Sequence, residues 1–221
     1  MSVAFFDLDG TLIKTKSLLS FFEYYIDTNP TLKTRLSWQL IEYAMQHLIS
    51  VGVATDVVNQ WFYQKNFGGL DVSELATSAS AWFEEKRHTN FFFDDVVAKL
   101  KEHKNLGAEI VIVTDSFYEV VKPIADYLEV SDLLCAPLEI IDGKYSGQLT
   151  ALPMIGKGKA EAIKRYLSLR GNAEPTYGYG DDFSDMNFLE LVDKPVASSA
   201  CGPTNFLKIA RSQSWKIIEA S

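Results

Sequence analysis

The sequence has few of the residues that mark several large classes of protein. It contains 2 cysteines and 3 histidines among 221 residues. Cys135 and Cys201 form no closely spaced pair, and neither has a histidine at metal-ligand spacing. The pattern therefore favours neither a disulfide framework nor a zinc site. We expect two buried thiols in a reducing compartment.

Long apolar runs and basic clusters are also missing. No run approaches the about 20 apolar residues of a membrane-spanning helix, so we expect no membrane span. There are 21 basic and 29 acidic residues, for a net charge of −8, and the basic ones are not clustered. This charge pattern predicts no nucleic-acid partner. The chain opens on a strand pattern without a basic leader, which predicts a cytoplasmic protein. Nothing in the sequence specifies an oligomeric state.

What the sequence does contain is a regular alternation of apolar patterns. Hydrophobic residues make up 47% of the chain, enough for a substantial core. Between residues 17 and 87 the apolar spacing is helical throughout, in four successive segments. From residue 94 onward, predicted helices, the first of them capped by Asp94, alternate with short apolar strands. Residues 138–147 are typical of a hairpin. This order predicts an α/β fold with a doubly wound, Rossmann-like parallel sheet and an inserted all-helical cap domain.

The first predicted strand, residues 3–6, ends in two carboxylates. Asp7 and Asp9 are followed by Gly10 and Thr11, which interrupt the strand pattern. Two acids at the end of a buried strand repel each other, so they need a cation or a shared proton. The same residues could also form an ordinary acidic turn, because Asp-Gly is a common turn pair.

Three further polar clusters follow predicted strands or lead into predicted helices. They are Thr114-Asp115-Ser116, then Gly156-Lys157-Gly158-Lys159, and then the run from Gly180 through Asp181 and Asp182 to Asp185. Each could be a helix cap, a solvated loop or an acidic turn. In a doubly wound sheet, however, the carboxyl ends of the strands meet at one edge. Carboxylates, a hydroxyl and a lysine brought together there would suit phosphoryl transfer.

These motifs resemble those of the haloacid dehalogenase superfamily of aspartyl phosphotransferases. The Asp-Leu-Asp-Gly-Thr-Leu run at residues 7–12 is similar to the first motif of the family. Thr114, Lys159 and the Gly180-Asp181…Asp185 run are similar to its second, third and fourth motifs. The helical insertion looks like the C1-type cap of the phosphoserine phosphatase-like subclass. The resemblance implies a catalytic core of residues 1–15 and 90–221 and a helical cap of residues 16–89.

The resemblance also implies a role for each motif residue. Asp7 would be the nucleophile that forms an aspartyl-phosphate, and Asp9 the general acid and base. Mg²⁺ would bind the Asp7 carboxylate, the Asp9 backbone carbonyl and Asp181. The phosphoryl group would be held by the Thr114 hydroxyl, by Lys159 and by backbone N–H groups near Gly10 and Asp115. Supporting positions would be Thr11, Asp182 and Asp185, with Lys157 as the alternative lysine.

The function implied is hydrolysis of a small phosphorylated metabolite by an Mg²⁺-dependent phosphomonoesterase. A phosphotransferase, or a signalling module that keeps a stable aspartyl-phosphate, stays open as an alternative. Lys16 occupies the place where phosphoserine phosphatases usually carry an acidic residue, a departure that argues against phosphoserine as the substrate. Histidinol phosphate, phosphocholine and lipid phosphates are other candidate substrates. Six aromatic residues of the predicted cap could pack in its core or line a pocket: Tyr24, Trp38, Tyr43, Trp61, Tyr63 and Trp82.

Overall fold

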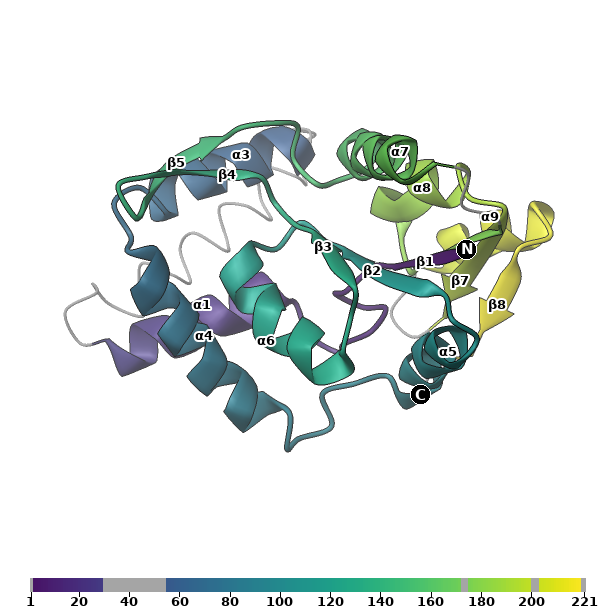
Figure 1. Cartoon of the computed structure of the whole chain (residues 1–221), viewed down its shortest axis with the longest axis horizontal. Helices are drawn as coiled ribbons and strands as arrows, with labels where there is room; N and C mark the ends of the chain where they lie inside the picture. The colour runs from purple at the N-terminus through teal and green to yellow at the C-terminus, as the bar shows by residue number, and fades with distance from the viewer. Residues whose placement is uncertain (1, 30–54, 172–174, 200–202, 220–221) are drawn as a thin grey trace.

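In the computed structural model, which describes residues 2–29, 55–171, 175–199 and 203–219, helices flank a six-stranded parallel sheet (Figure 1). The strand order is β3-β2-β1-β6-β7-β8, and every neighbouring pair is parallel. The strands are β1 (Val3–Phe6), β2 (Glu109–Val113), β3 (Asp132–Leu134), β6 (Thr176–Gly180), β7 (Lys194–Ser198) and β8 (Lys216–Ile218). The predicted doubly wound α/β fold is confirmed.

Strand β1 lies in the interior of the sheet because its sequence is apolar at every position. Its four side chains are all buried and point alternately to opposite faces. Ala4 and Phe6 join one hydrophobic cluster, whereas Val3 and Phe5 join the other. A strand with both faces covered must be apolar throughout, as parallel sheets require.

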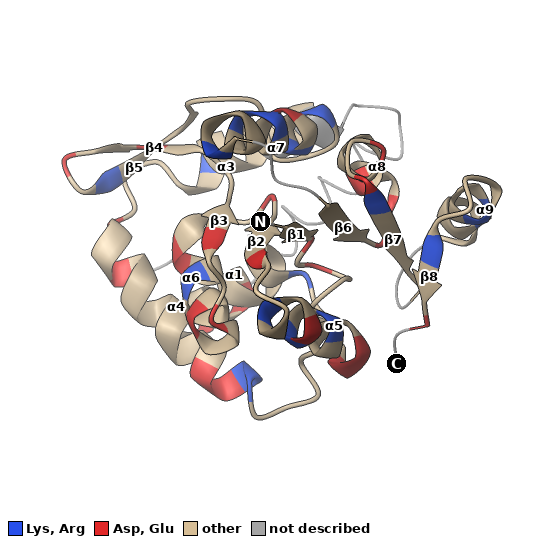
Figure 2. Ribbon diagram, turned by 45° about the vertical axis from the view of Figure 1, so that its right-hand side comes forward, with Lys and Arg blue, Asp and Glu red and all other residues tan. Residues whose placement is uncertain are grey.

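Helices cover both faces of the sheet. One face carries α7 (Lys157–Arg170), α8 (Met186–Leu189) and α9 (Thr204–Ser212), and the other carries α5 (Asp94–Asn105) and α6 (Tyr118–Leu128). The expectation that Asp94 caps α5 is wrong. Phe93 occupies the cap position, and Asp94 lies in the first turn, where its charge still complements the helix dipole. Acidic and basic residues are interspersed over most of these helices (Figure 2).

The described part of residues 16–89 contains helices and no strand. These helices are α1 (Ser17–Thr28), α3 (Thr55–Asn66) and α4 (Val72–Lys86), and the helical segment predicted between residues 32 and 52 lies outside the described residues. Five buried phenylalanines join α1 and α3 to the start of α6. This aromatic cluster consists of Phe21, Phe22, Phe62, Phe67 and Phe117. Among the residues described, no helix combines the length and the apolar character that crossing a membrane requires.

The predicted hairpin forms beside α3, as Figure 1 shows. It pairs β4 (Leu138–Ile141) with β5 (Lys144–Leu149) in antiparallel register. Asp142 and Gly143 both have positive φ angles, 50° and 76°, which a tight hairpin turn requires. Cys135, after β3, is a free thiol that is only partly buried, contrary to expectation; Cys201 lies outside the described residues.

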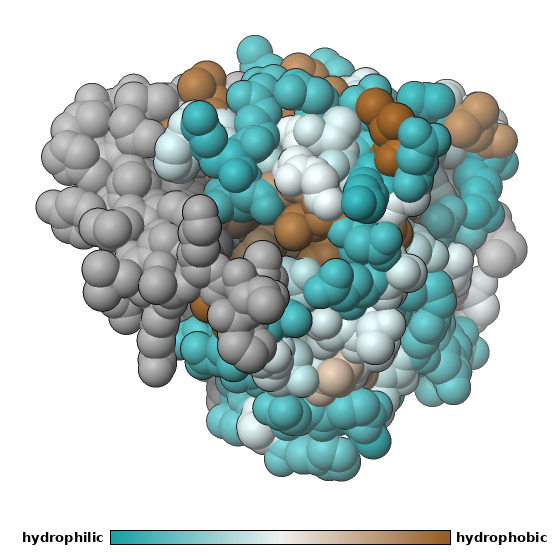
Figure 3. Space-filling view, turned by 90° about the vertical axis from the view of Figure 1, so that its left-hand side faces the viewer, coloured by the Kyte–Doolittle hydropathy of each residue, from teal (hydrophilic) through white to brown (hydrophobic). Residues whose placement is uncertain are grey.

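Figure 3 looks onto the end of the molecule that carries α1, α3 and α4. The described surface at this end is mostly hydrophilic. Hydrophobic atoms are visible in a hollow near the middle of the view. Apolar surface is therefore accessible at the end that carries α1, α3 and α4, whereas most large aromatic side chains of the described residues are buried.

Candidate active site

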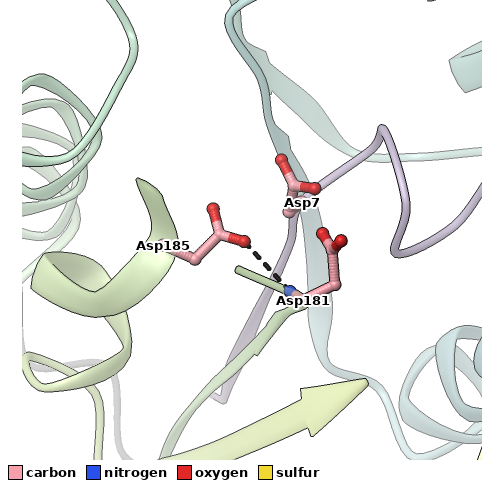
Figure 4. Close-up of side chains that lie close together, drawn as sticks. All are labelled: Asp7, Asp181 and Asp185. Atoms are coloured by element: carbon pink, nitrogen blue, oxygen red, sulfur yellow. Dashed lines mark hydrogen bonds between the residues drawn. The ribbon is translucent and has the colours of Figure 1, made fainter. Parts of the chain in front are cut away.

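The sequence-predicted polar residues meet at the carboxyl ends of three neighbouring strands. Asp7 follows β1, Thr114 follows β2 and Asp181 follows β6. Strands β2 and β3 extend the sheet on one side of β1, whereas β6, β7 and β8 extend it on the other. The topological switch point therefore lies between β1 and β6, where ligands bind in sheets of this kind. Figure 4 shows the carboxyl groups gathered at this point.

Lys159 lies at the centre of the site and bridges two carboxylates. Its Nζ donates to Asp7 Oδ1 at 2.5 Å and to Asp185 Oδ1 at 2.7 Å. Lys159 is 2%, Asp7 5% and Asp185 0% exposed, whereas the alternative Lys157 is exposed to solvent. Burial disfavours the ammonium, but the carboxylates of Asp185 and Asp7 outweigh it and hold the pKa of Lys159 well above its usual value. We call Asp7, Asp181, Asp185 and Lys159 the acid cluster.

Asp185 also fixes the loop that follows β6. Its Oδ2 accepts the backbone N–H of Asp181 at 3.0 Å, drawn in Figure 4, and that of Asp182 at 3.4 Å. A Cβ at Gly180 would lie 2.7 Å from the Asp185 side chain, so the loop needs glycine there. Burial, followed by the nearby charge of Asp7, raises the pKa of Asp185 to about 7. Its carboxylate is thus fully engaged by protein donors.

Asp181 is held against the turn that follows β1. Thr11 Oγ1 donates to Asp181 Oδ1 at 3.1 Å. Gly10 has a φ of +97°, and a Cβ there would lie only 2.4 Å from Asp181 Oδ2. Glycine at this turn therefore serves both the backbone angle and the close approach of the carboxylate. Burial and then the charges of Asp7 and Asp185 raise the pKa of Asp181 to about 8.

The acid cluster has the composition of a divalent cation site. One carboxylate oxygen from each of Asp7, Asp181 and Asp185 lies within 4.8 Å of the others. Buried carboxylates whose pKa values rise to 7 or 8 are short of positive charge, and oxygen donors suit a hard cation such as Mg²⁺. Gly10 keeps the space beside Asp181 free of a side chain. The residues present therefore fit a divalent metal.

Asp9 lies two residues beyond Asp7, and its carboxyl and carbonyl groups have different partners. Asp9 Oδ1 accepts the backbone N–H of Ser17 at 3.0 Å, and the Asp9 carbonyl accepts Lys16 Nζ at 3.2 Å. Burial and the charge of Asp115 raise the pKa of Asp9 to about 7, against the opposing effect of Lys16. A carboxyl group with this pKa can hold and release a proton near neutral pH.

The loop after β2 is held by a tyrosine of α3. The Tyr63 hydroxyl donates to the backbone carbonyl of Asp115. Thr114 is fully buried, and its Oγ1 accepts the N–H of Ser116 at 3.1 Å. Burial raises the pKa of Asp115, with the two lysines opposing. Helix α3 is therefore in direct contact with the loop that carries two of the predicted phosphate-binding positions.

Several predicted positions lie away from the acid cluster. The Asp182 carboxylate accepts the N–H and hydroxyl of Ser184 at 2.6 Å each and caps the short 3₁₀ helix η1 (Phe183–Asp185). Trp82 is fully buried and donates to Ser20 Oγ at 3.2 Å, which is a packing role. Tyr24 and Trp61 are half-buried, and Trp38 and Tyr43 lie outside the described residues.

Sequence reasoning missed two contacts of this site. Lys16 brings a second ammonium to it, and Tyr63 ties α3 to the loop after β2. The only sequence signal for the first was a lysine at a position where the resemblance implies an acidic residue. No local pattern distinguished Tyr63 from the other aromatic residues of the helical segment.

Comparison with known proteins identifies the family to which the chain belongs. A family model described as haloacid dehalogenase-like hydrolase matches residues 4–190. The chain is 28% identical to a protein of Mycobacterium tuberculosis named "Probable phosphatase", over 100% of the chain and 76% of the relative. It is 24% identical to a histidinol-phosphatase of Neisseria meningitidis, over 98% of each.

Solved structures share the same fold. A Bordetella pertussis protein of unknown function superposes with a TM-score of 0.87 at 22% identity, over 99% of this chain and 98% of that one. A phospho-aspartyl intermediate analogue of phosphoserine phosphatase superposes with a TM-score of 0.65 at 17% identity, over 98% of this chain and 91% of that one.

Proposed function

We propose that the chain, which belongs to the haloacid dehalogenase-like hydrolases, hydrolyses a small phosphorylated metabolite with Mg²⁺ through an aspartyl-phosphate on Asp7. The premise is that it is a phosphatase with the fold of phosphoserine phosphatases. One observation carries the proposal. A buried lysine joins Asp7 to Asp185 at the switch point of the sheet, with Asp181 alongside. Such a costly set of buried charges supports a catalytic role better than a structural one.

The reaction would run in two displacements at phosphorus. An Asp7 carboxylate oxygen attacks the phosphorus, the bond to the leaving oxygen breaks, and that oxygen takes a proton from Asp9. A water molecule then attacks the same phosphorus while Asp9 takes its proton. Phosphate leaves, and the Asp7 carboxylate is restored. Lys159, bonded to Asp7 Oδ1, orients the nucleophile and offsets charge on the phosphoryl group.

The pKa of Asp9 supports its part in both steps. A value of about 7 leaves the group protonated in a large fraction of molecules at neutral pH, as donation to the leaving oxygen requires. The same group, once deprotonated, can accept a proton from water. This property favours hydrolysis of the aspartyl-phosphate over its retention as a stable signal.

We propose the Asp7 and Asp181 carboxylates and the Asp9 carbonyl as the protein ligands of Mg²⁺. Asp185 has both oxygens bound to protein donors, which suits it to orienting Lys159. Bound there, Mg²⁺ would offset the negative charges of the carboxylates and of the phosphate. Thr11 would hold Asp181 in place through its hydroxyl.

The phosphoryl oxygens would be held by the Thr114 hydroxyl, by Lys159 and by backbone N–H groups near Gly10 and Asp115. We propose that the helices of residues 16–89 form a cap that contacts the leaving group. The hydrogen bond from Tyr63 to the loop after β2 supports this placement.

Hydrolysis of para-nitrophenyl phosphate with MgCl₂ tests the assignment. Asp7→Asn should lower kcat by about four orders of magnitude or more, since the nucleophile is lost. Asp142→Asn makes the same change in the exposed hairpin turn and is the matched control, with activity unchanged. Activity that survives in a folded Asp7→Asn protein would reject the mechanism.

A panel of phosphoserine, histidinol phosphate, phosphocholine, nucleotides and lysophosphatidate would then rank the substrates by kcat/KM. Adding an alcohol such as glycerol separates hydrolysis from transfer, because a phosphotransferase would form glycerol phosphate at the expense of free phosphate. An aspartyl-phosphate that persists for minutes to hours would instead favour the signalling alternative.

A further inference from the structure

Lys16 is a cation at the site for which the proposed reaction has no use. Lys16 is the residue directly before α1 and is exposed to solvent. Its side chain makes no capping hydrogen bond to the helix. Its Nζ donates to the backbone carbonyl oxygen of Asp9 at 3.2 Å. Among the residues that the structure describes, that oxygen is its one hydrogen-bond acceptor.

The side chain reaches into a region with an excess of acid. Its charge interacts with the carboxylates of Asp9, Asp7, Asp181 and Asp115, in that order of strength. Lys159, the other ammonium of the site, is already bonded to Asp7 and Asp185. Lys16 therefore places positive charge near Asp9 and Asp181, to which Lys159 donates no hydrogen bond.

We propose that Lys16 is a resident counter-cation that competes with Mg²⁺ for the Asp9 carbonyl oxygen and thereby weakens Mg²⁺ binding. This inference rests on the proposed function, which assigns that oxygen to the metal. An ammonium hydrogen-bonded to a metal ligand would stand within a few ångströms of the metal, where like charges repel strongly. Mg²⁺ binding must therefore displace the ammonium, and its exposed side chain can withdraw into water.

The competition has a second consequence, in the metal-free protein. With Mg²⁺ absent, Lys16 offsets part of the repulsion among the carboxylates. Removing its charge should then destabilise the metal-free protein while improving Mg²⁺ binding. A lysine with a purely structural role would not produce these two opposite effects.

Titration calorimetry of Mg²⁺ into the full-length protein, without substrate, tests the proposal. Lys16→Met keeps the length of the side chain and removes its charge, and should lower the Mg²⁺ dissociation constant about tenfold. Lys16→Arg should stay within about twofold of the wild type, because the charge is kept. Lys14→Met is the matched control, since Lys14 donates to Asn90 Oδ1 at 2.9 Å instead, and should bind Mg²⁺ like the wild type.

Asp181→Asn reports on the metal site itself and should lose Mg²⁺ binding. If Asp181→Asn loses binding but Lys16→Met binds Mg²⁺ no more tightly than the wild type, the inference about Lys16 is overturned and the proposed metal site stands. If no protein in the series binds Mg²⁺, the metal part of the proposed function and this inference fail together. Thermal unfolding in EDTA provides the second readout, with Lys16→Met expected to melt below the wild type.

Discussion

The aromatic cluster and the acid cluster are both almost fully buried, yet they act on stability in opposite directions. The phenylalanines lose apolar contact with water on folding, which stabilises the protein by about 1.5–3 kcal/mol for each side chain. The buried carboxylates lose hydration, and the raised pKa values of Asp181 and Asp185 show that burial disfavours their charged forms. Packing of α1 and α3 against the start of α6 thus stabilises the fold, whereas the buried carboxylates at the carboxyl ends of the strands destabilise it.

This difference explains where the molecule keeps buried carboxyl groups whose charged forms are disfavoured. Glu119 and Tyr145 are hydrogen-bonded near the aromatic cluster, but the carboxyl groups whose pKa is raised to about 7 or 8 all lie at the site: Asp9, Asp181 and Asp185. Groups perturbed by burial and like charges tend to gather where chemistry needs them. Changes in the two regions should therefore be distinguishable by experiment.

The largest effect on stability is expected in the aromatic cluster. Phe67 is fully buried, and its ring centroid lies 4.8 Å from that of Phe117 and 5.1 Å from that of Phe22. Phe67→Ala should lower the free energy of unfolding by about 3–5 kcal/mol. Urea unfolding measures this, and kcat of the protein that remains folded should change only a few-fold.

Leu169→Ala is the control for that substitution, because Leu169 is 79% exposed. It should change the free energy of unfolding by less than about 0.5 kcal/mol. Equal losses in the two variants would show that the aromatic cluster does not supply the stability attributed to it.

The next effect is a pH dependence that arises from the acid cluster and from Asp9. Asp181, Asp185 and Asp9 have pKa values of about 8, 7 and 7 in the folded protein, above those of unfolded carboxyls. The folded state then binds more protons than the unfolded state between pH 4 and 8, so stability falls as the pH rises through this range. In EDTA, the melting temperature should be lower at pH 8 than at pH 6.5.

Starting at pH 6.5 limits the opposing contribution of His103, because burial lowers its pKa in the folded protein and an unfolded histidine has lost about half of its protons by that pH. MgCl₂ should remove the decline, since a metal favours ionised carboxylates. Asp181→Asn should also flatten it. A melting temperature in EDTA that rises between pH 6.5 and 8 would contradict this account.

The smallest effect is expected where the two regions meet. Tyr63 belongs to α3, packs against Phe62 and Phe67, and bonds through its hydroxyl to the loop at Asp115. Tyr63→Phe keeps the ring and should cost about 1 kcal/mol of stability and at most about tenfold in kcat/KM. Tyr127→Phe, which alters a tyrosine that is 52% exposed, is the control and should affect neither quantity. A loss in Tyr63→Phe as large as that of Asp7→Asn would make its hydroxyl part of the chemistry.

The sequence predicted the elements whose signals are local. Strand β1 is apolar at each position, and the turn at Asp142 and Gly143 carries residues that accept positive φ angles. Strand β3 was not predicted, because its three residues show no alternation and gain their strand geometry from pairing with β2. Asp94 was wrongly expected to cap α5, since an acid one residue inside the helix leaves much the same local signal.

The motifs predicted which residues would gather at the edge of the sheet, but not how each carboxylate would be used. Asp185 and Asp182 belong to one acidic run, yet one bonds to Lys159 and the other caps a short helix. Lys16 reaches the Asp9 carbonyl through the path of the turn after β1. Such partners depend on side-chain directions in three dimensions, which residue spacing does not encode.

The position of β1 between β2 and β6 sets an order of events during synthesis. The carboxylates that follow β1 are made before Asp181, which is added roughly 10–30 seconds later at common translation rates. Until then the repulsion between Asp7 and Asp181 cannot arise in the nascent chain. The acids can be brought together only after most apolar residues of the sheet and its helices are available. A truncated chain that ends before β6 should thus be unable to form the proposed aspartyl-phosphate, which would make activity a late reporter of folding.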